Sequence, residues 1–424
     1  MATNNLVVGL DIGTTKVCAV IGERNDAGVL AITGVGTSLS TGMRKGVVVN
    51  IEATLRAVVA AIEAAEMMSG LDVNACWTGI GGTHIDGINS RGVVAVSGKN
   101  RETREISVDD LSRVLEAARA VVIPMDRQVL EVIPQSYIVD NQKGIKDPLD
   151  MIGVRLEAEV HIITCSVTSA QNLVKCVNRA GFIVNDLVLQ SLAASRSTLT
   201  EEEKELGVAL IDLGGGTTEA IVYTQGTPFS TSTISIGGVQ VTSDISVVKN
   251  IAFETAERIK LESGCCWETL LEEDDDIVVP GIGGRTPVAI PRYQLLEIIK
   301  PRMEEIFVMV KERLDRLSLF RPLGGGIVLT GGGAQLLGAA ELAASIFQLP
   351  VRIGIPLPLG GLEEEYRSPE YATAVGLVLE GNDREKHRVG ERASALSFSA
   401  DKREDSSIAR LFSRIRDYWK KELF

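Results

Sequence analysis

Short apolar runs that end in glycines alternate with segments of helical period along the first part of the chain. The stretch LVVGLDIGTTKVCAVIG at 6–22 predicts a strand, a turn and a second strand. The apolar positions then change to the helical period, which predicts a helix over 51–68 with Asn50 as its N-cap. NACWTGIGG at 74–82 predicts another strand with a glycine-rich end. This alternation is typical of an α/β domain.

The pattern changes between residues 84 and 163. Extended segments are predicted at 92–98, 128–140 and 156–165, and they surround one predicted helix at 108–121. We therefore expect a small α+β module that is inserted into a larger domain.

The opening pattern returns in the second half, after a charged turn predicted at 200–207. GVALIDLGGGTTEAIVYTQG at 207–226 parallels VVGLDIGTTKVCAVIGE at 7–23. Both segments place an apolar strand before an aspartate, and glycines, a Thr-Thr pair and a second apolar strand after it. The two aspartates, Asp11 and Asp212, are 201 residues apart. An internal duplication accounts for this repeat, and it predicts two similar domains that face each other.

The other segments continue the α/β pattern. Helical periods at 169–181 and 187–199 precede the second aspartate, and a longer one at 293–317 is interrupted near Pro301. A strand that ends in glycines is predicted within 324–338, and further helices are predicted at 339–347 and 369–381.

The composition is that of a soluble protein with more than one core. The chain has 424 residues, of which 45% are hydrophobic and 23% are charged. No apolar run approaches the ~20 residues that span a bilayer, and no secretory signal opens the chain. We therefore expect a cytosolic protein that does not cross a membrane. Six cysteines without a CxxC pair and only three histidines argue against a Cys/His metal site.

The net charge of −13 is distributed unevenly. Residues 406–424 carry five basic and two acidic groups, residues 382–405 carry six of each, and the body at 1–381 therefore holds −16. An acidic body argues against nucleic acid as a partner.

The two duplicated loops carry residues suited to phosphate binding. Glycines after a strand allow backbone N–H groups to approach phosphate oxygens, because no Cβ blocks them. Asp11 and Asp212 begin these loops, and a carboxylate at the end of an apolar strand requires a partner such as Mg²⁺ with its waters. The predicted cofactors are ATP and Mg²⁺, and the predicted nucleotide-binding residues, beside the two aspartates, are Gly13, Thr14, Thr15, Lys16, Gly214, Gly215, Gly216, Thr217 and Thr218.

Two further segments are candidates for the nucleoside. TGGGAQLLG at 330–338 is a strand, glycines and a helix start, a turn that suits an adenine or ribose as well as an ordinary α/β crossover. ETAERIKLESG at 254–264 places Glu257 and Lys260 three residues apart on one helix face, where a surface ion pair is the alternative.

The motifs and their order along the chain resemble those of the actin-like ATPase superfamily, which includes actin, sugar kinases and the heat-shock chaperone ATPase. Five elements occur in the order expected for this superfamily: a first phosphate loop (11–16), a connecting helix (188–197), a second phosphate loop (212–218), an adenosine loop (328–334) and a second connecting helix (371–379). The resemblance is strongest to the FtsA family of bacterial cell-division proteins and covers nearly the whole chain.

The resemblance implies a fold class and a set of domains. It implies an α/β actin-like ATPase fold, in which two duplicated domains surround a nucleotide cleft. The implied divisions are a first domain at 1–83 with 164–200 and 366–381, an inserted α+β subdomain at 84–163, a second domain at 201–240 with 303–365, a smaller subdomain at 241–302, a flexible linker at 382–406 and an amphipathic helix at 407–424.

It also implies roles for particular residues. Glu257 and Lys260 are expected to embrace the ribose and adenine, and Gln190 is expected to orient water near the metal or γ-phosphate. No stronger general base is evident, so we expect weak ATPase activity or none. The implied nucleotide-lining glycines are Gly237, Gly238, Gly332 and Gly333.

The C-terminal end predicts a membrane tether. In a helix of ~100° per residue, the apolar residues of 407–424 fall within about 120° of one another. A tryptophan with flanking basic residues favours an anionic lipid surface over the alternative, packing on the protein's own core. The predicted membrane-binding residues are Ile408, Leu411, Phe412, Ile415, Trp419 and Leu423 on the apolar face, with Arg410, Arg414, Arg416, Lys420 and Lys421 around it.

The resemblance implies an ATP-binding adaptor that tethers the tubulin-like protein FtsZ to the cytoplasmic face of the inner membrane at the division site. Self-association into actin-like filaments and recruitment of other division proteins are implied as well. The surface expected to bind the FtsZ C-terminal tail lies within 241–302, where Arg302, Lys300 and Arg292 suit an acidic peptide. The alternatives are an adaptor similar to PilM for a membrane-protein tail and a small-molecule kinase of the same superfamily.

Overall fold

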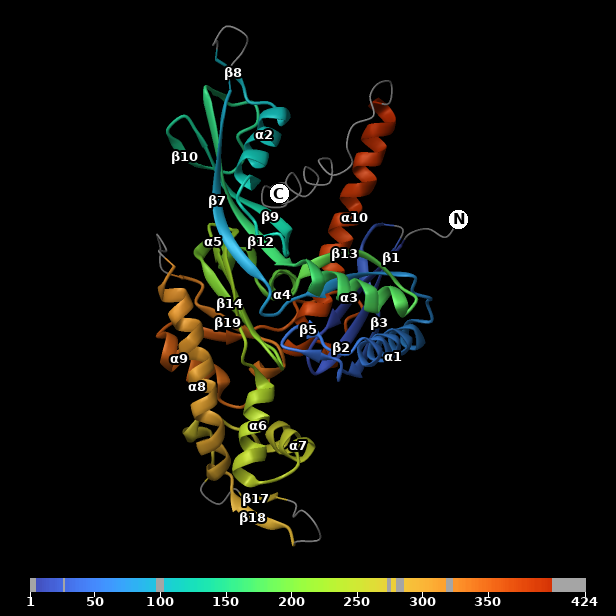
Figure 1. Cartoon of the computed structure of the whole chain (residues 1–424), viewed down its shortest axis with the longest axis vertical. Coiled ribbons are helices and arrows are strands. Elements are labelled where there is room, and N and C mark those ends of the chain that lie inside the picture. The colour runs from blue at the N-terminus through green and yellow to red at the C-terminus, as the bar shows by residue number, and fades with distance from the viewer. Residues whose placement is uncertain are drawn as a thin grey trace.

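The computed structural model describes residues 5–25, 27–96, 103–272, 276–279, 286–317 and 323–398. Each half of the chain forms a five-stranded mixed sheet, and a third, four-stranded sheet belongs to the inserted segment (Figure 1). The predicted α/β arrangement of two related domains is confirmed.

The first sheet has the order β13-β6-β1-β2-β3. Its centre is the predicted strand–turn–strand unit, because β1 runs antiparallel to β2 and parallel to β6. Asn50 caps the first helix as predicted, since its side chain accepts a hydrogen bond of 3.0 Å from the Ala53 N–H. The elements are β1 (Leu6–Ile12), β2 (Lys16–Arg24), β3 (Leu30–Leu39), β4 (Met43–Arg44), β5 (Val47–Val48), α1 (Ile51–Ser69), β6 (Ala75–Ile80), α3 (Val167–Arg179) and β13 (Ile183–Leu189).

The second sheet repeats this plan in the order β16-β15-β14-β19-β20. Its central strand β14 runs antiparallel to β15 and parallel to β19, as β1 does with β2 and β6. The duplicated sequence pattern therefore folds into duplicated strand–turn–strand units. The strands are β14 (Val208–Leu213), β15 (Thr218–Thr224), β16 (Thr227–Ile234), β19 (Ile327–Thr330) and β20 (Val351–Ile353).

Helices and a hairpin extend the second half downward in Figure 1, away from the inserted subdomain. The predicted interruption at Pro301 is wrong, because α8 runs through it without a break. Its apolar face, which includes Ile299 and Met303, is buried in the second core and holds the helix together. Apart from β19 and β20, the elements that follow β16 up to residue 366 are α6 (Gly238–Lys249), α7 (Phe253–Ser263), η1 (Glu268–Leu270), β17 (Asp276–Val279), β18 (Val288–Pro291), α8 (Tyr293–Asp315), η2 (Gly332–Gln335), α9 (Ala339–Phe347) and η3 (Glu364–Tyr366).

The inserted segment forms the expected α+β subdomain with a core of its own. One face of its sheet, in the order β10-β9-β12-β7, is covered by α2 (Figure 1). Its elements are β7 (Asp86–Ala95), β8 (Arg104–Glu105), α2 (Val108–Arg119), β9 (Arg127–Val139), β10 (Gln142–Ile145), β11 (Ile152–Gly153) and β12 (Arg155–Ser166).

The connection between the halves differs from the prediction in two places. The predicted helix at 187–199 begins as the end of β13, and α4 spans only Gln190–Thr198. The predicted turn at 200–207 contains a short helix, α5 (Glu201–Leu206). Thr200 and Glu203 form a reciprocal capping box there, which satisfies N–H groups that a one-turn helix otherwise leaves unpaired.

The last described helix, α10 (Ala372–Phe398), follows the short turn η4 (Pro369–Tyr371). It packs against α4 so closely that a Cβ on Gly376 would lie 1.8 Å from the Ala193 carbonyl oxygen. Only glycine fits at this crossing of the two connecting helices.

The predicted linker is wrong over its first part, because α10 continues to Phe398 and projects beside the inserted subdomain (Figure 1). Arg384, which is 9% exposed, pairs at 2.9 Å with Glu131 on β9 and at 3.2 Å with Asp186 on β13. It also pairs at 2.7 Å with Glu380 one turn earlier. Polar residues here thus form a buried ionic network, where the polar pattern predicted a solvated chain. The predicted amphipathic helix at 407–424 lies outside the described residues.

Candidate functional site

The tips of the two duplicated hairpins face each other. The first turn, between β1 and β2, is closed by a 2.9 Å hydrogen bond from the Gly13 N–H to the Lys16 carbonyl. A Cβ on Gly215 or on Gly216 would lie 2.6 Å from Thr15 or Thr14, respectively. The structure therefore brings together the two predicted phosphate loops, and glycine in the second loop allows this approach.

The two aspartates lie at the bases of these loops. Asp11 accepts a 2.6 Å hydrogen bond from the Gln190 amide, and Asp212 accepts one of 3.3 Å from the Thr373 hydroxyl. Burial raises the pKa of Asp11, and burial together with the charge of Asp11 raises the pKa of Asp212 to about 6. The two carboxylates therefore repel each other, and a divalent cation between them would offset that repulsion.

Among the described residues, no group of three or more His, Cys, Asp or Glu side chains has the arrangement of a metal site. Two carboxylates are too few for a metal site formed by protein ligands alone. They fit an ion that keeps most of its waters and takes other ligands from a triphosphate, which is how Mg²⁺ is usually held.

Gln190 is the first residue of α4, and it lies beside a carboxylate that the sequence analysis missed. A Cβ on Gly81 would lie 2.0 Å from the Gln190 side-chain oxygen and 2.3 Å from Oε1 of Glu219. Glu219 accepts a 2.7 Å hydrogen bond from the Gly82 N–H, and burial and then Asp212 raise the pKa of Glu219 to about 8. A carboxylate inside an apolar strand, directly opposite Asp212 in the sheet register, was the available signal.

Lys16 lies on the first loop, and its ammonium group is held by residues just before α10. Its Nζ donates to Glu370 Oε2 at 2.8 Å and to the Glu370 carbonyl at 3.0 Å. It also lies 4.0 Å from the centre of the Tyr371 ring. The charge of Lys16 lowers the pKa of Asp11 and Asp212, although burial outweighs it, so this lysine is electrostatically part of the site.

The second loop is joined to the start of α6. The Gly238 N–H donates to the Gly214 carbonyl at 2.9 Å, and a Cβ on Gly237 would lie 2.4 Å from the same oxygen. Thr217 lies at the hairpin tip, whereas the Thr218 hydroxyl donates to the Ile236 carbonyl at 2.8 Å. Thr218 therefore supports the loop from behind. The start of α6 is hydrogen-bonded to the same loop, since the Val239 N–H donates to the Gly215 carbonyl at 2.8 Å.

Glu257 and Lys260 form an ion pair of 2.8 Å on α7. Both side chains also contact Thr242 on α6, and Lys260 donates to the Gly238 carbonyl at 3.3 Å. The pair therefore bridges two helices next to the second loop.

The predicted adenosine loop lies against the end of β14. A Cβ on Gly331 would lie 2.2 Å from Asp212 Oδ1, and one on Gly333 would lie 2.9 Å from Leu213, whereas one on Gly332 would meet nothing within 4 Å. Gly332 and Gly333 form the turn η2, so the loop closes on the same carboxylate that begins the second phosphate loop.

The predicted tail-binding cations lie on α8 or at its start. Arg302 pairs with Asp244 at 2.6 Å and also with Glu305, and Arg292 donates to the Ser263 carbonyl at 2.6 Å. Lys300 is half-buried. An acidic peptide would therefore compete with Asp244 for Arg302.

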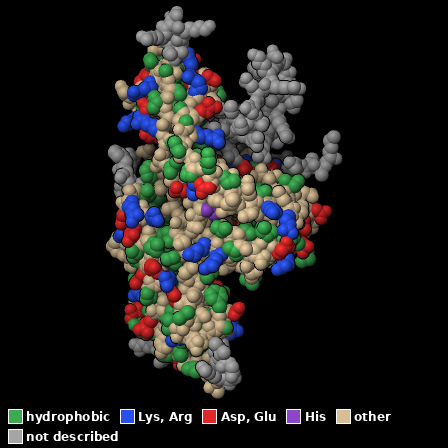
Figure 2. Space-filling view, in the orientation of Figure 1, with side chains coloured by type: hydrophobic (Ala, Val, Ile, Leu, Met, Phe, Trp, Pro, Cys, Tyr) green, Lys and Arg blue, Asp and Glu red, His purple; other side chains and the backbone are tan. Residues whose placement is uncertain are grey.

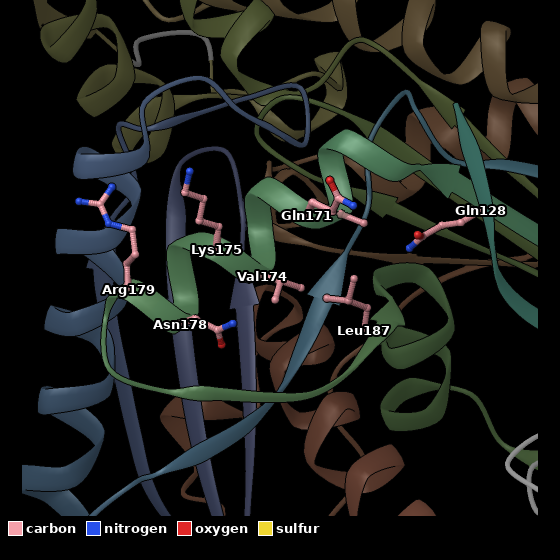
Figure 3. A pocket seen from close by; sticks show the side chains of 8 residues that line it. Gln128, Gln171, Val174, Lys175, Asn178, Arg179 and Leu187 are labelled. Carbon is pink, nitrogen blue, oxygen red and sulfur yellow. The ribbon is translucent and has the colours of Figure 1, made fainter. Parts of the chain in front are cut away.

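A pocket of about 460 Å³ lies elsewhere, between α3, β9 and β13. Figure 3 shows Val174 and Leu187 at its floor, with Gln171, Lys175 and Asn178 around it. None of the predicted nucleotide residues lines it. Figure 2 shows acidic and basic side chains interspersed over the visible face of the molecule.

Comparison with known proteins shows the family to which the chain belongs. Residues 209–376 match the family model "Cell division protein FtsA", and residues 82–164 match "SHS2 domain inserted in FTSA". Cell division protein FtsA of Borreliella burgdorferi is 45% identical over 423 residues, covering 100% of both chains. The chain belongs to the FtsA family of cell division proteins. The FtsA protein of Pseudomonas aeruginosa is 43% identical, over 96% of this chain and 97% of that protein.

Solved structures of lower identity share the actin-like fold of this FtsA-family chain. A PilM-PilN type IV pilus biogenesis complex matches with a TM-score of 0.63 and 16% identity, over 89% of this chain and 98% of that one. MreB5 of Spiroplasma citri bound to AMPPNP matches with a TM-score of 0.53 and 15% identity, over 92% and 99%. Full-length identity to FtsA proteins thus assigns the family, which the likeness to PilM in fold alone does not. Within the described part of the chain, no helix has the length and apolar character that spanning a membrane requires.

Proposed function

We propose that this FtsA-family chain binds Mg·ATP between its two hairpin loops and acts as a membrane-tethered adaptor in cell division. The observation that carries the nucleotide part is the convergence of the duplicated loops. The glycines of the second loop lie against Thr14 and Thr15, Asp11 and Asp212 lie at the bases of the loops, and the charge of Lys16 lowers the pKa of both aspartates. Backbone N–H groups, a cation and two carboxylates for a hydrated metal together suit a magnesium triphosphate.

Each part of the site has a role in this proposal. Asp11 and Asp212 hold Mg²⁺ through water, and the loop glycines and threonines bind the phosphates. Glu257 and Lys260 at α7, with Gly237, Gly238, Gly332 and Gly333, enclose the nucleoside. Mg²⁺ would supply neutralisation of the phosphate charge.

The groups near the metal site suit slow hydrolysis. Gln190 is hydrogen-bonded to Asp11, so its amide is oriented toward the loops. It is a weak base, and the raised pKa of Glu219 keeps that carboxyl largely protonated near neutral pH. ATP therefore acts mainly as a conformational ligand, with weak ATPase activity or none.

The adaptor part rests on family membership and on the C-terminal sequence. An apolar face with a tryptophan and five basic residues suits an anionic leaflet, at roughly 1 kcal/mol for each cation. One such helix binds the membrane weakly. Several helices on one self-associated filament bind it strongly, because the first contact raises the effective concentration of the others at the membrane. The partners in this proposal are the FtsZ C-terminal tail at 241–302, further copies of the chain, and other division proteins, at the cytoplasmic face of the inner membrane.

The test is co-sedimentation with anionic liposomes, with and without Mg·ATP. The truncated protein should end at Phe398, because a cut at Gly381 would divide α10 and remove Arg384, which pairs with Glu131. We expect the full chain to sediment and the truncated protein to remain in solution, while both bind Mg·ATP. Equal behaviour of the two proteins contradicts the tether, and phosphoryl transfer to a small-molecule acceptor would favour a kinase.

A further inference from the structure

The turn before α10 contacts three segments of the nucleotide site at once. Glu370 holds Lys16 of the first loop, and Thr373 donates to Asp212 at the base of the second loop. The Pro369 carbonyl accepts hydrogen bonds of 3.2 Å from the Gly331 N–H and from the Thr330 hydroxyl, at the adenosine loop. α10 extends from this turn to Phe398, so its first turn belongs to the site and its other end leads in sequence to residues 399–424.

The contact between Lys16 and Glu370 is one in which another anion can replace the Glu370 carboxylate. Two of the three N–H donors of the ammonium group point to Glu370, and the Tyr371 ring lies 4.0 Å away on another side. The side chains of Lys16 and Glu370 are 26% and 34% exposed, so water screens their attraction. An ion pair of this kind contributes little free energy and can be replaced by another anion.

We propose that Glu370 and a bound triphosphate compete for the Lys16 ammonium group, so that nucleotide binding releases the turn η4 at the start of α10. Glu370 is then a positioning residue that lowers affinity for nucleotides with terminal phosphates. It also links the occupancy of the site to the helix that leads to the C-terminal segment. This inference rests on the proposed binding of Mg·ATP.

Two features give the competition its direction. A triphosphate carries several negative charges, whereas Glu370 carries one, so the phosphates attract Lys16 more strongly where both are within reach. The carboxylate also lies on the side of Lys16 that faces α10, so a lysine that turns toward the loops leaves Glu370 without this partner. Loss of that contact acts on the helix start, where backbone N–H groups have no partners within the helix.

The first experiment compares nucleotide affinities of full-length variants by isothermal titration calorimetry. We expect Glu370→Gln to tighten binding of Mg·ATP by about two- to fivefold and to leave binding of AMP unchanged. The matched control is Glu364→Gln, which removes a carboxylate that pairs with Arg367 and not with Lys16. It should leave both affinities unchanged. Weaker Mg·ATP binding by Glu370→Gln, or equal tightening for AMP, overturns the competition.

A second measurement keeps the test independent of folding defects. In a Lys16→Met background, Glu370→Gln should no longer change Mg·ATP affinity, because no ammonium group remains to compete for. Mg·ATP should also speed amide hydrogen exchange at 369–376 in the unmodified chain and not in Glu370→Gln. Failure of the unmodified chain to bind Mg·ATP overturns the proposed function as well. Binding without a Lys16-dependent effect of Glu370 overturns this inference alone.

Discussion

At the scale of single residues, the site contains carboxylates that the folded protein holds at a cost. Asp212 has its pKa raised to about 6, by burial first and then by the charge of Asp11. At neutral pH it is nevertheless mostly ionised, so the folded state bears a repulsion that the unfolded chain lacks. Such strain is expected where a metal–phosphate ligand offsets it.

This cost predicts opposite effects of Asp212→Asn on stability and on binding. Because Asp212 keeps part of its surface open to water, we expect the free energy of unfolding at pH 8 to rise by about 1–2 kcal/mol. Mg·ATP affinity should fall at least tenfold, since one of two carboxylates for the metal is lost. Chemical denaturation and calorimetry measure both quantities. A variant that is destabilised and still binds Mg·ATP normally contradicts the assignment.

Neighbouring glycines give a matched pair of tests for the adenosine loop. Gly331 has a φ of 80°, and its added Cβ would lie 2.2 Å from Asp212, whereas Gly332 has open space there. Gly331→Ala should lower the free energy of unfolding by about 1–3 kcal/mol, and Gly332→Ala should change it by less than about 0.5 kcal/mol. Thermal unfolding of both variants checks this. Similar losses would show that the φ and the contact at Gly331 do not set the conformation of the loop.

The sequence revealed the site residues whose chemistry is local. Asp11, Lys16 and the loop glycines stand together in one short motif, and the structure brings that motif to its duplicate. Glu219 had a local signal, its place in an apolar strand opposite Asp212 in the same hairpin. Glu370 had none, because its importance depends on a contact between distant segments. Lys16 and Glu370 are 354 residues apart, and no period or spacing links them.

At the scale of elements, the spacing of apolar residues predicted strands and helices wherever an element buries one face and exposes the other. The strand–turn–strand units and the capped helix α1 were found in this way. The rule failed where polar residues carry the structure, in α5 with its capping box and in α10 beyond residue 381. In α10 a charged sequence is held by ion pairs with other elements, and composition alone cannot distinguish that from a solvated linker.

The α10 network yields a stability prediction. Arg384→Met removes the cation that pairs with Glu131, whose side chain is 8% exposed, so we expect a loss of about 3–5 kcal/mol in the free energy of unfolding. The control is Arg367→Met, because Arg367 pairs with Glu364, whose side chain is 83% exposed. This variant should lose less than about 1 kcal/mol in the free energy of unfolding. Urea denaturation measures both. An equally small loss for Arg384→Met would mean that these ion pairs do not hold the extended part of α10 against the other elements.

At the scale of the whole molecule, the inserted subdomain joins the two halves of the chain. It interrupts the first half, yet it lies against β16, the edge strand of the second sheet. Asn89 donates to the Phe229 carbonyl at 3.1 Å, and Gln135 donates to the Pro228 carbonyl at 3.0 Å. Side-chain amides thus cover an edge strand whose backbone groups are otherwise open to another chain.

His161 lies in the middle of this contact and makes it sensitive to acid. Its ring bonds to Asn89 at 2.6 Å and to Thr231 of β16 at 3.0 Å, and the residue is 1% exposed. Burial lowers the pKa of His161 to about 4, so the folded state favours the neutral ring. Its contribution to stability is therefore complete above pH 6.5 and is lost as the pH falls toward 4.

Between about pH 7 and pH 4.5 this histidine should remove about 2–3 kcal/mol from the free energy of unfolding. Carboxylates titrate over the same range, so the informative quantity is the difference from His161→Gln, which lacks the titrating ring and keeps a polar side chain. We expect denaturation midpoints of the variant to fall less steeply with acid, and hydrogen exchange in β7 and β16 to rise first in the unmodified protein. Parallel pH profiles for the two proteins would mean that burial of His161 does not control how the subdomain docks on the second half.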